Sequence, residues 1–213
     1  MKSTLFTLLV LLSAAVYAGD KQYQQAMGSG IPAMFEADDP EELQEAINKL
    51  ARIGDAEKDK WEPYYYTAFG YLRLSGMMEA PTDKDKYLNL AIEEVEKAIA
   101  IKPSESELEA MRGYVYMMQL AVDPATRGMK YSGLAYTAFE KALAMNPENP
   151  RAHFLMGRMQ YGAAKFMGGD TSEACNSLGT ARKIFEQDKS NDNPFAPAWG
   201  KEATEQALES LCL

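Results

Sequence analysis

The feature that most constrains the fold is a pattern of small and large apolar residues that recurs after 44 residues. Residues 135–147 read AYTAFEKALAMNP, and the pattern consists of Ala135, Phe139, Ala142 and Pro147. Each member has a counterpart 44 residues upstream, namely Ala91, Val95, Ala98 and Pro103. Small residues at helical spacing let a neighbouring helix approach closely, a large residue fills the space between helices, and proline stops the helix. A repeated helical unit is therefore predicted.

This pattern is typical of the second helix of the tetratricopeptide repeat (TPR), and the chain resembles the TPR family. First helices are predicted to begin at Pro63, near Ser106 and at Pro150. They carry residues at the spacing of the first-helix pattern W-x2-L-G-x2-Y: Tyr66, Phe69 and Gly70, then Gly113 and Tyr116, then Met156 and Gly157. The resemblance implies an all-α, right-handed α-α superhelix of three long helix–turn–helix repeats with a capping helix at each end.

The first eighteen residues have the features of a secretory signal peptide. Lys2 gives a positive start, an apolar run follows at 5–12, and the small residues that end at Ala18 give a cleavage site. No later stretch approaches the roughly 20 apolar residues of a membrane span. The protein is therefore expected to be exported, to the periplasm or the medium.

The expected domain organisation follows from these boundaries. Residues 28–32 (GSGIP) are expected to interrupt any helix that precedes them, because glycine is flexible and proline restricts its neighbour. The successive parts are a signal peptide at 1–18, a lead-in and capping helix at 19–62, repeats at about 63–105, 106–149 and 150–187, and a C-terminal capping helix within 188–213.

The 44-residue period exceeds the about 34 residues of an ordinary TPR, so the first two repeats each hold roughly ten extra residues. We expect these residues to form loops between the two helices of a repeat, at 76–85 and 122–133. Such loops are either tolerated surface segments or parts of a binding surface. The loop candidates for a site are Arg127, Lys130, Tyr131, Gly168, Gly169 and Asp170.

Two of these stretches carry a second resemblance. Segments of small exported bacterial TPR proteins resemble two stretches of this chain, DPATRGMKY at 123–131 and KFMGGD at 165–170. The glycine corner of the second stretch, Gly168-Gly169-Asp170, is similar to that of the T component of periplasmic TRAP-type transporters. The likeness implies a small-solute-binding accessory of a transport system, in which Arg127 and Lys130 close over an anionic solute. The structural interpretation is that Asp170 caps the next helix and Arg127 forms a salt bridge within its repeat.

The TPR resemblance also implies a concave face lined by the first helices. The candidate groove residues are Tyr64, Tyr71, Tyr114, Met117, Arg151, Phe154, Arg158 and Tyr161. Aromatic and arginine side chains carry much of the energy of protein interfaces, so this face suits a peptide or a partner helix. The alternative is that tyrosine and methionine at this spacing fill the core.

Charge and composition exclude several other functions. The formal net charge is −9, and −10 once Lys2 leaves with the signal peptide, which argues against nucleic acid or an anionic membrane as partner. The single histidine, His153, has no neighbours at metal-ligand spacing, and no nucleophile or phosphate-binding motif occurs. We expect no metal, no cofactor and no enzymatic activity. The predicted function is a protein- or peptide-interaction module.

The two cysteines are expected to pair. Cys175 lies near the start of the second helix of the third repeat, and Cys212 lies at the end of the capping helix. Because successive TPR helices run antiparallel, these two positions lie at the same end of the helix pair. An oxidising compartment permits the bond, which would fasten the C-terminus to the solenoid.

Overall fold

The computed structural model describes residues 3–187 and 193–212, with side chains described from residue 20 onward. Every regular element in these ranges is a helix. The helices are α1 (Ser3–Glu36), α2 (Pro40–Ala56), α3 (Glu62–Met77), α4 (Pro81–Ile101), α5 (Ser106–Val122), α6 (Pro124–Met145), α7 (Pro150–Met167), α8 (Ser172–Gln187) and α9 (Lys201–Cys212).

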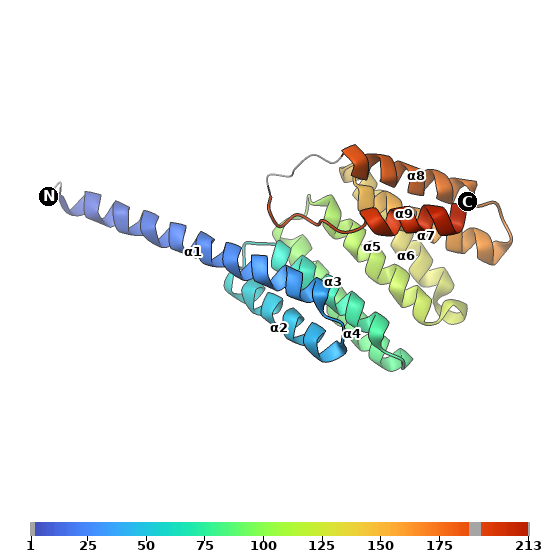
Figure 1. Ribbon diagram of the computed structural model, residues 1–213, viewed down its shortest axis with the longest axis horizontal. Coiled ribbons are helices and arrows are strands. Elements are labelled where there is room, and N and C mark those ends of the chain that lie inside the picture. The colour runs from blue at the N-terminus through green and yellow to red at the C-terminus, as the bar shows by residue number, and fades with distance from the viewer. Residues whose placement is uncertain (1–2, 188–192, 213) are drawn as a thin grey trace.

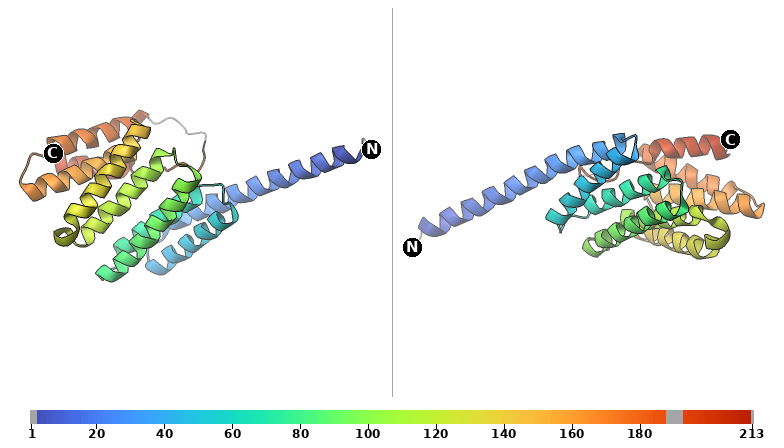
Figure 2. Two further views of the ribbon diagram at one scale, coloured as in Figure 1. Left: turned by 180° about the vertical axis from the view of Figure 1, so that it is seen from behind. Right: turned by 90° about the horizontal axis from the view of Figure 1, so that it is seen from below.

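The helices pack as antiparallel pairs that stack along one direction (Figure 1). The pairs α3/α4, α5/α6 and α7/α8 are the three predicted repeats. Of their first helices, α5 contacts both α3 and α7, and the three form an inner layer, while α4, α6 and α8 form an outer layer. A further pair, α1/α2, packs on α3, and α9 packs on α8 and α7 (Figures 1 and 2). The all-α solenoid predicted from the sequence is confirmed.

The repeated apolar pattern faces the core. On α6 the buried residues are Ala135, Ala138, Phe139 and Ala142, and on α4 they are Leu88, Ala91, Val95 and Ala98. The glycines of α5 and α7 let the two helices of a repeat approach closely. A Cβ on Gly113 would lie 2.3 Å from the Phe139 ring, and one on Gly157 would lie 2.9 Å from Leu178.

The predicted loops within the first two repeats are wrong, because most of these residues are helical. Helix α4 begins at Pro81 and α6 begins at Pro124. Proline is well suited to a first helical turn, and the Asp123 carboxylate accepts a hydrogen bond from the Thr126 amide at 3.3 Å. The ten extra residues of each repeat therefore add about three turns of helix rather than a loop.

The predicted interruption near residues 28–32 is also wrong, because α1 continues through it to Glu36. Tyr23, Met27 and Met34 are buried, so the packing of α1 outweighs the local preference of glycine and proline. Arg73 of α3 holds the end of the helix by donating to the carbonyls of Met34 and Ala37. Among the helices described, none is long and apolar enough to cross a membrane.

Candidate ligand-binding site

Trp199 lies at the meeting point of the three inner helices. Its indole stacks on Phe69 of α3, with 5.0 Å between ring centroids, and lies 5.8 Å from the ring of Tyr114 of α5. The indole N–H donates to the Tyr65 hydroxyl at 2.9 Å. The Trp199 carbonyl accepts from Arg151 of α7 at 2.8 Å. One residue outside the repeats thus joins all three of them.

The segment 193–200 runs from α3 to the start of α9 and covers part of the inner layer. The Asn193 amide donates to Glu62 at 2.8 Å, and the Tyr66 hydroxyl donates to the Ala196 carbonyl at 3.1 Å. Phe195 packs edge-to-face on Tyr23 of α1, with 5.4 Å between centroids. The C-terminal capping helix α9 begins at Lys201, directly after Gly200, whose φ of 111° is not helical.

Arg151 of α7 links α5 to the segment before α9. Its side chain is 7% exposed, its Nε donates to Glu107 Oε2 at 2.7 Å, and its guanidinium lies over the rings of Phe185 and Trp199. The ion pair of Arg151 and Glu107 is buried between α5, α7 and the segment before α9, so each charge is paired with the other. Of the predicted groove residues, Arg151 therefore faces the concave side but is already engaged by the protein itself.

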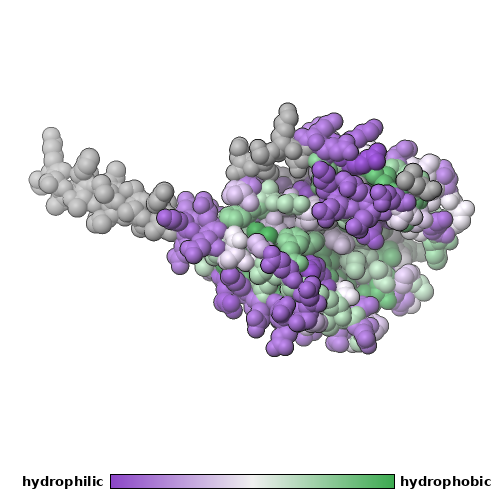
Figure 3. Space-filling view, viewed as in Figure 1, coloured by the Kyte–Doolittle hydropathy of each residue, from purple (hydrophilic) through white to green (hydrophobic). Residues whose placement is uncertain are grey.

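Four predicted groove residues lie on α5 and α7, the two helices that Trp199 contacts through Tyr114 and Arg151. These are Tyr114 and Met117, which are half-buried, Tyr161, which is also half-buried, and Arg158, which is exposed. We call Trp199, Tyr114, Met117, Arg158 and Tyr161 the inner-face patch. Figure 3 shows apolar side chains gathered over α5 between α9 and α3. Phe154, the remaining α7 candidate, is 3% exposed and lies beneath the Arg158 guanidinium, 5.8 Å from it.

The electrostatics of the patch are set by Arg158 and Tyr114. Arg158 makes no salt bridge to any carboxylate that the structure describes, so its charge is available to a ligand. Burial raises the pKa of the Tyr114 hydroxyl, and the positive charge of Arg158 partly offsets this effect. The hydroxyl is therefore neutral at physiological pH and can donate a hydrogen bond.

Tyr64 and Tyr71 are not brought to this face. The Tyr64 hydroxyl donates to the Gly54 carbonyl of α2 at 2.8 Å, and Tyr71 stacks on Tyr87 of α4. The residues that precede α3, α5 and α7, namely Trp61, Glu105 and Asn149, are spaced by 44. The groove candidates Tyr71 and Tyr114 are instead 43 residues apart. One residue turns a helix by about 100°, so both tyrosines point toward α2 and α4.

The α3 residues that do face Trp199 are Tyr65 and Phe69, while Tyr66 reaches the carbonyl of Ala196. In the repeat pattern Tyr66 and Phe69 occupy packing positions between helices, so they were not predicted to lie in the groove. The spacing of 44 between the residues that precede α3, α5 and α7 is the signal that could have placed them there.

The candidate residues of the supposed loop lie on helix α6 instead. Arg127 forms a two-point ion pair with Asp85 of α4, at 2.5 and 2.7 Å. Lys130 lies over the ring of Tyr131, which in turn packs near Tyr116 of α5. Arg127 thus forms a salt bridge, but it joins the second repeat to the first rather than lying within its own repeat as expected. These residues lie between α4, α5 and α6 and share none with the inner-face patch.

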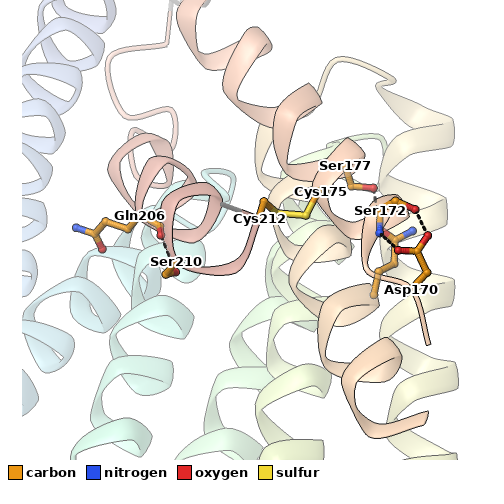
Figure 4. The surroundings of a disulfide bond; sticks show 8 residues. Asp170, Ser172, Cys175, Ser177, Gln206, Ser210 and Cys212 are labelled. Atoms are coloured by element: carbon orange, nitrogen blue, oxygen red, sulfur yellow. Dashed lines mark hydrogen bonds between the residues drawn. A yellow bond between two sulfur atoms is a disulfide. The ribbon is translucent and has the colours of Figure 1, made fainter. Parts of the chain in front are cut away.

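The glycine corner joins α7 to α8 (Figure 4). Gly168 has a φ of 68°, in the left-handed region, and ends α7, while the Asp170 carboxylate accepts from the Ser172 amide at 3.1 Å. A disulfide links Cys175 of α8 to Cys212 of α9, the pairing expected from the sequence. On the same end of the molecule, Phe166 and Met167 are 88% and 76% exposed.

No group of three or more metal-binding side chains occurs among the residues with described side chains. The Nε2 atom of His153 lies 2.8 Å from the Pro147 carbonyl, which places the histidine in a local contact at the start of α7.

Solved structures of two other proteins resemble the chain. The HusA haemophore from Porphyromonas gingivalis is 26% identical, with a TM-score of 0.76 over 87% of this chain and 90% of the other. TTC0263, a thermophilic TPR protein from Thermus thermophilus, is 18% identical, with a TM-score of 0.56 over 83% of this chain and 90% of the other. The second similarity establishes the TPR-like fold.

Comparison with curated protein sequences gives no match. A family model, by contrast, matches residues 33–167, which is more than half of the chain and runs from the end of α1 through α7. The protein therefore belongs to the family of the regulator of microtubule dynamics proteins 1–3.

Proposed function

We propose that the protein is an exported, non-enzymatic binding protein whose inner-face patch holds a flat aromatic solute of the haem class. The observation that carries this proposal is the similarity to a haemophore, which extends over most of both chains at 26% identity. The proposal retains the small-solute carrier that the sequence suggested and gives its ligand a chemical class.

The residues of the patch suit such a ligand. Haem is a flat apolar ring system with two carboxylates at one edge. Trp199 and Tyr114 offer aromatic surface, and Met117 offers a polarisable thioether that packs well on rings. Arg158 offers a planar guanidinium without a carboxylate partner among the described residues, which is the group that best pairs with a carboxylate.

The side chains available argue for binding through the ring system rather than through iron. Protein ligands of haem iron are histidine, cysteine, methionine or tyrosinate. The two cysteines form a disulfide, and His153 lies against the Pro147 carbonyl. Burial raises the pKa of Tyr114, so its phenol stays protonated. Met117 is then left in the patch as a neutral thioether, so we expect the ring system to supply most of the affinity and iron-free protoporphyrin to bind about as tightly as haem.

Titration of haem and of iron-free protoporphyrin into the protein, followed by visible absorption, tests this function. We expect saturable binding of both, and Arg158→Glu should weaken each by about tenfold, or about 1.4 kcal/mol. Lys183→Glu is the matched control, because Lys183 is exposed on the side of α8 opposite the buried Ala181 and Phe185. Absence of saturable binding, or equal effects of the two charge reversals, would contradict the proposal.

A second candidate is the protein-interaction module predicted from the sequence, since the TPR-like fold is typical of such modules. The observation in its favour is the pair Phe166 and Met167, with Met129 of α6 95% exposed. Large exposed apolar side chains mark interaction sites. The test is capture of a partner by the wild-type protein but not by the Phe166→Ser, Met167→Ser double variant, with unchanged porphyrin binding.

Export is part of the proposal and has its own test. The signal peptide predicted at 1–18 should be removed in the native host, so the intact mass should place the N-terminus at Gly19. A periplasmic transport system, which the glycine corner suggested, is the setting we propose for the solute. Protein that retains Met1 and stays in the cytoplasm would contradict this part.

A further inference from the structure

A polar cavity of about 380 Å³ lies between α4, α5 and α6. The residues that line it are Asp85, Asn89, Gln119, Thr126, Arg127, Lys130 and Tyr131. It is built by the extra turns that lengthen α4 and α6 beyond an ordinary repeat. It shares no residue with the inner-face patch, and its volume lies within the range of small-molecule sites.

Gln119 is the residue of this cavity that indicates a bound ligand. The side chain is 5% exposed, and its amide nitrogen donates to Asn89 Oδ1 at 3.3 Å. Its oxygen, Oε1, accepts no hydrogen bond from the residues that the structure describes. A buried acceptor without a donor destabilises a folded protein, so such groups are normally matched by a partner. A hydroxyl or amide of a ligand would supply the missing donor.

The charged side chains around the cavity indicate which second group the ligand carries. Arg127 and Asp85 neutralise each other through two hydrogen bonds, and Arg127 also donates to the Gln119 carbonyl at 3.4 Å. Lys130 is exposed, makes no salt bridge within the described chain, and lies 4.9 Å from the centroid of the Tyr131 ring. The cavity therefore has one uncompensated positive charge beside an aromatic ring.

These groups exclude the simpler ligand classes. An anion without donors, such as sulfate or acetate, cannot satisfy the Gln119 acceptor. A cation would be repelled by the positive charges of Lys130 and Arg127. A neutral polyol would gain nothing from the charge of the exposed Lys130, so it should bind more weakly than a hydroxylated anion.

We propose that this cavity binds a small hydroxylated carboxylate of the sugar-acid type. The carboxylate pairs with Lys130, a hydroxyl donates to Gln119 Oε1, and the C–H face of the sugar ring lies against Tyr131. The Asn89 amide donates to, and the Asp85 carboxylate accepts from, the remaining hydroxyls. The site is separate from the inner-face patch and does not depend on porphyrin binding.

Isothermal titration with D-glucuronate as the probe tests the proposal. We expect saturable binding of glucuronate, and glucose and acetate should each bind at least about tenfold more weakly. Gln119→Leu should abolish the binding of glucuronate while it raises the melting temperature, because leucine has a similar shape and removes the unmatched acceptor. Lys130→Ala should weaken glucuronate binding, and Lys183→Ala on α8 should leave it unchanged.

Three results would overturn the inference. They are equal binding of acetate and glucuronate, unchanged glucuronate binding by Gln119→Leu, and no saturable heat with glucuronate. Porphyrin titration of the same Gln119→Leu protein separates this inference from the proposed function. The variant should bind protoporphyrin as the wild type does, whichever result glucuronate gives.

Discussion

At the scale of single residues, the stacking depends on glycines that lie between the two helices of a repeat. The ring of Phe139 is fully buried and occupies the space where a Cβ on Gly113 would lie. Gly133, on the exposed side of α6, has no atom within 4 Å of the same position. The two glycines are equivalent in helix propensity and differ in packing alone.

Gly113→Ala should therefore destabilise the protein even though alanine favours helix. We expect a loss of about 1–3 kcal/mol from over-packing against Phe139. The control, Gly133→Ala, should gain up to about 1 kcal/mol. Urea unfolding followed by circular dichroism measures both, and equal effects of the two substitutions would show that Phe139 does not occupy this space.

Buried tyrosines make the fold sensitive to alkali. Burial raises the pKa of Tyr65 and Tyr66 well above the ordinary value of 10.0. In the unfolded chain both hydroxyls ionise near that ordinary value, so ionisation favours unfolding at higher pH. Stability should be constant below about pH 10 and fall above it, by about 1.4 kcal/mol per pH unit for each tyrosine.

Absorbance of tyrosinate against pH, recorded with helix content, checks this prediction. A group of tyrosines should ionise only together with the loss of helix. Smooth ionisation of all tyrosines in a protein that stays helical would contradict it.

At the scale of elements, the extended α4 and α6 are joined by the ion pair of Asp85 and Arg127. The Arg127 hydrogen bonds hold the pKa of Asp85 below its ordinary value of 3.8. The folded-state pKa is thus lower than the unfolded-state pKa, so the pair stabilises the fold above pH 3.8 and loses this effect as pH falls below it. Because the pair is partly exposed, we expect at most about 1 kcal/mol.

Asp85→Asn should accordingly lower stability at neutral pH and have little effect in acid. Urea midpoints of the wild type and the variant, measured at neutral pH and at a pH below 3.8, give the difference. A difference that persists unchanged in acid would mean that the ion pair is not its source.

The disulfide acts at the same scale, because it fastens α9 to α8 across a sequence separation of 37 residues. A loop of this size stabilises a fold by about 3–4 kcal/mol in the chain-entropy account. The Cys175→Ser, Cys212→Ser variant should lose about this amount, and amide exchange should quicken first in α9. Equal exchange in α9 of both proteins would show that the Trp199 contacts alone hold the helix.

At the scale of the whole molecule, the apolar pattern was sufficient to predict the architecture. The pattern at Ala135 and Phe139 recurs at Ala91 and Val95, and in both helices it faces the core. Helix continuity could not be predicted in the same way. Pro124 is compatible with either a loop or a first turn, and Gly28 and Pro32 stay helical only because Met27 and Met34 are buried by other helices.

The candidate site stays a prediction, and the register of the helices decides which residues it can include. Tyr114 and Met117 of α5 are each 44 residues before Arg158 and Tyr161 of α7, the same spacing as the residues that precede these helices. Tyr64 and Tyr71 do not join them, since a shift of one residue rotates α3 by about 100°. The position of Trp199 depends on contacts with Phe69 and Tyr65, which lie more than a hundred residues away in the sequence.

The central claim is that a flat aromatic solute binds at the inner-face patch. The most direct measurement is the methyl NMR spectrum of methionine-labelled protein during addition of iron-free protoporphyrin, because ring-current shifts act only at short range. Met117 lies within the patch, whereas Met129 and Met167 are exposed elsewhere. We predict a large shift of the Met117 methyl with little change at the other two. Shifts at Met129 or Met167 with an unchanged Met117 methyl would contradict the claim.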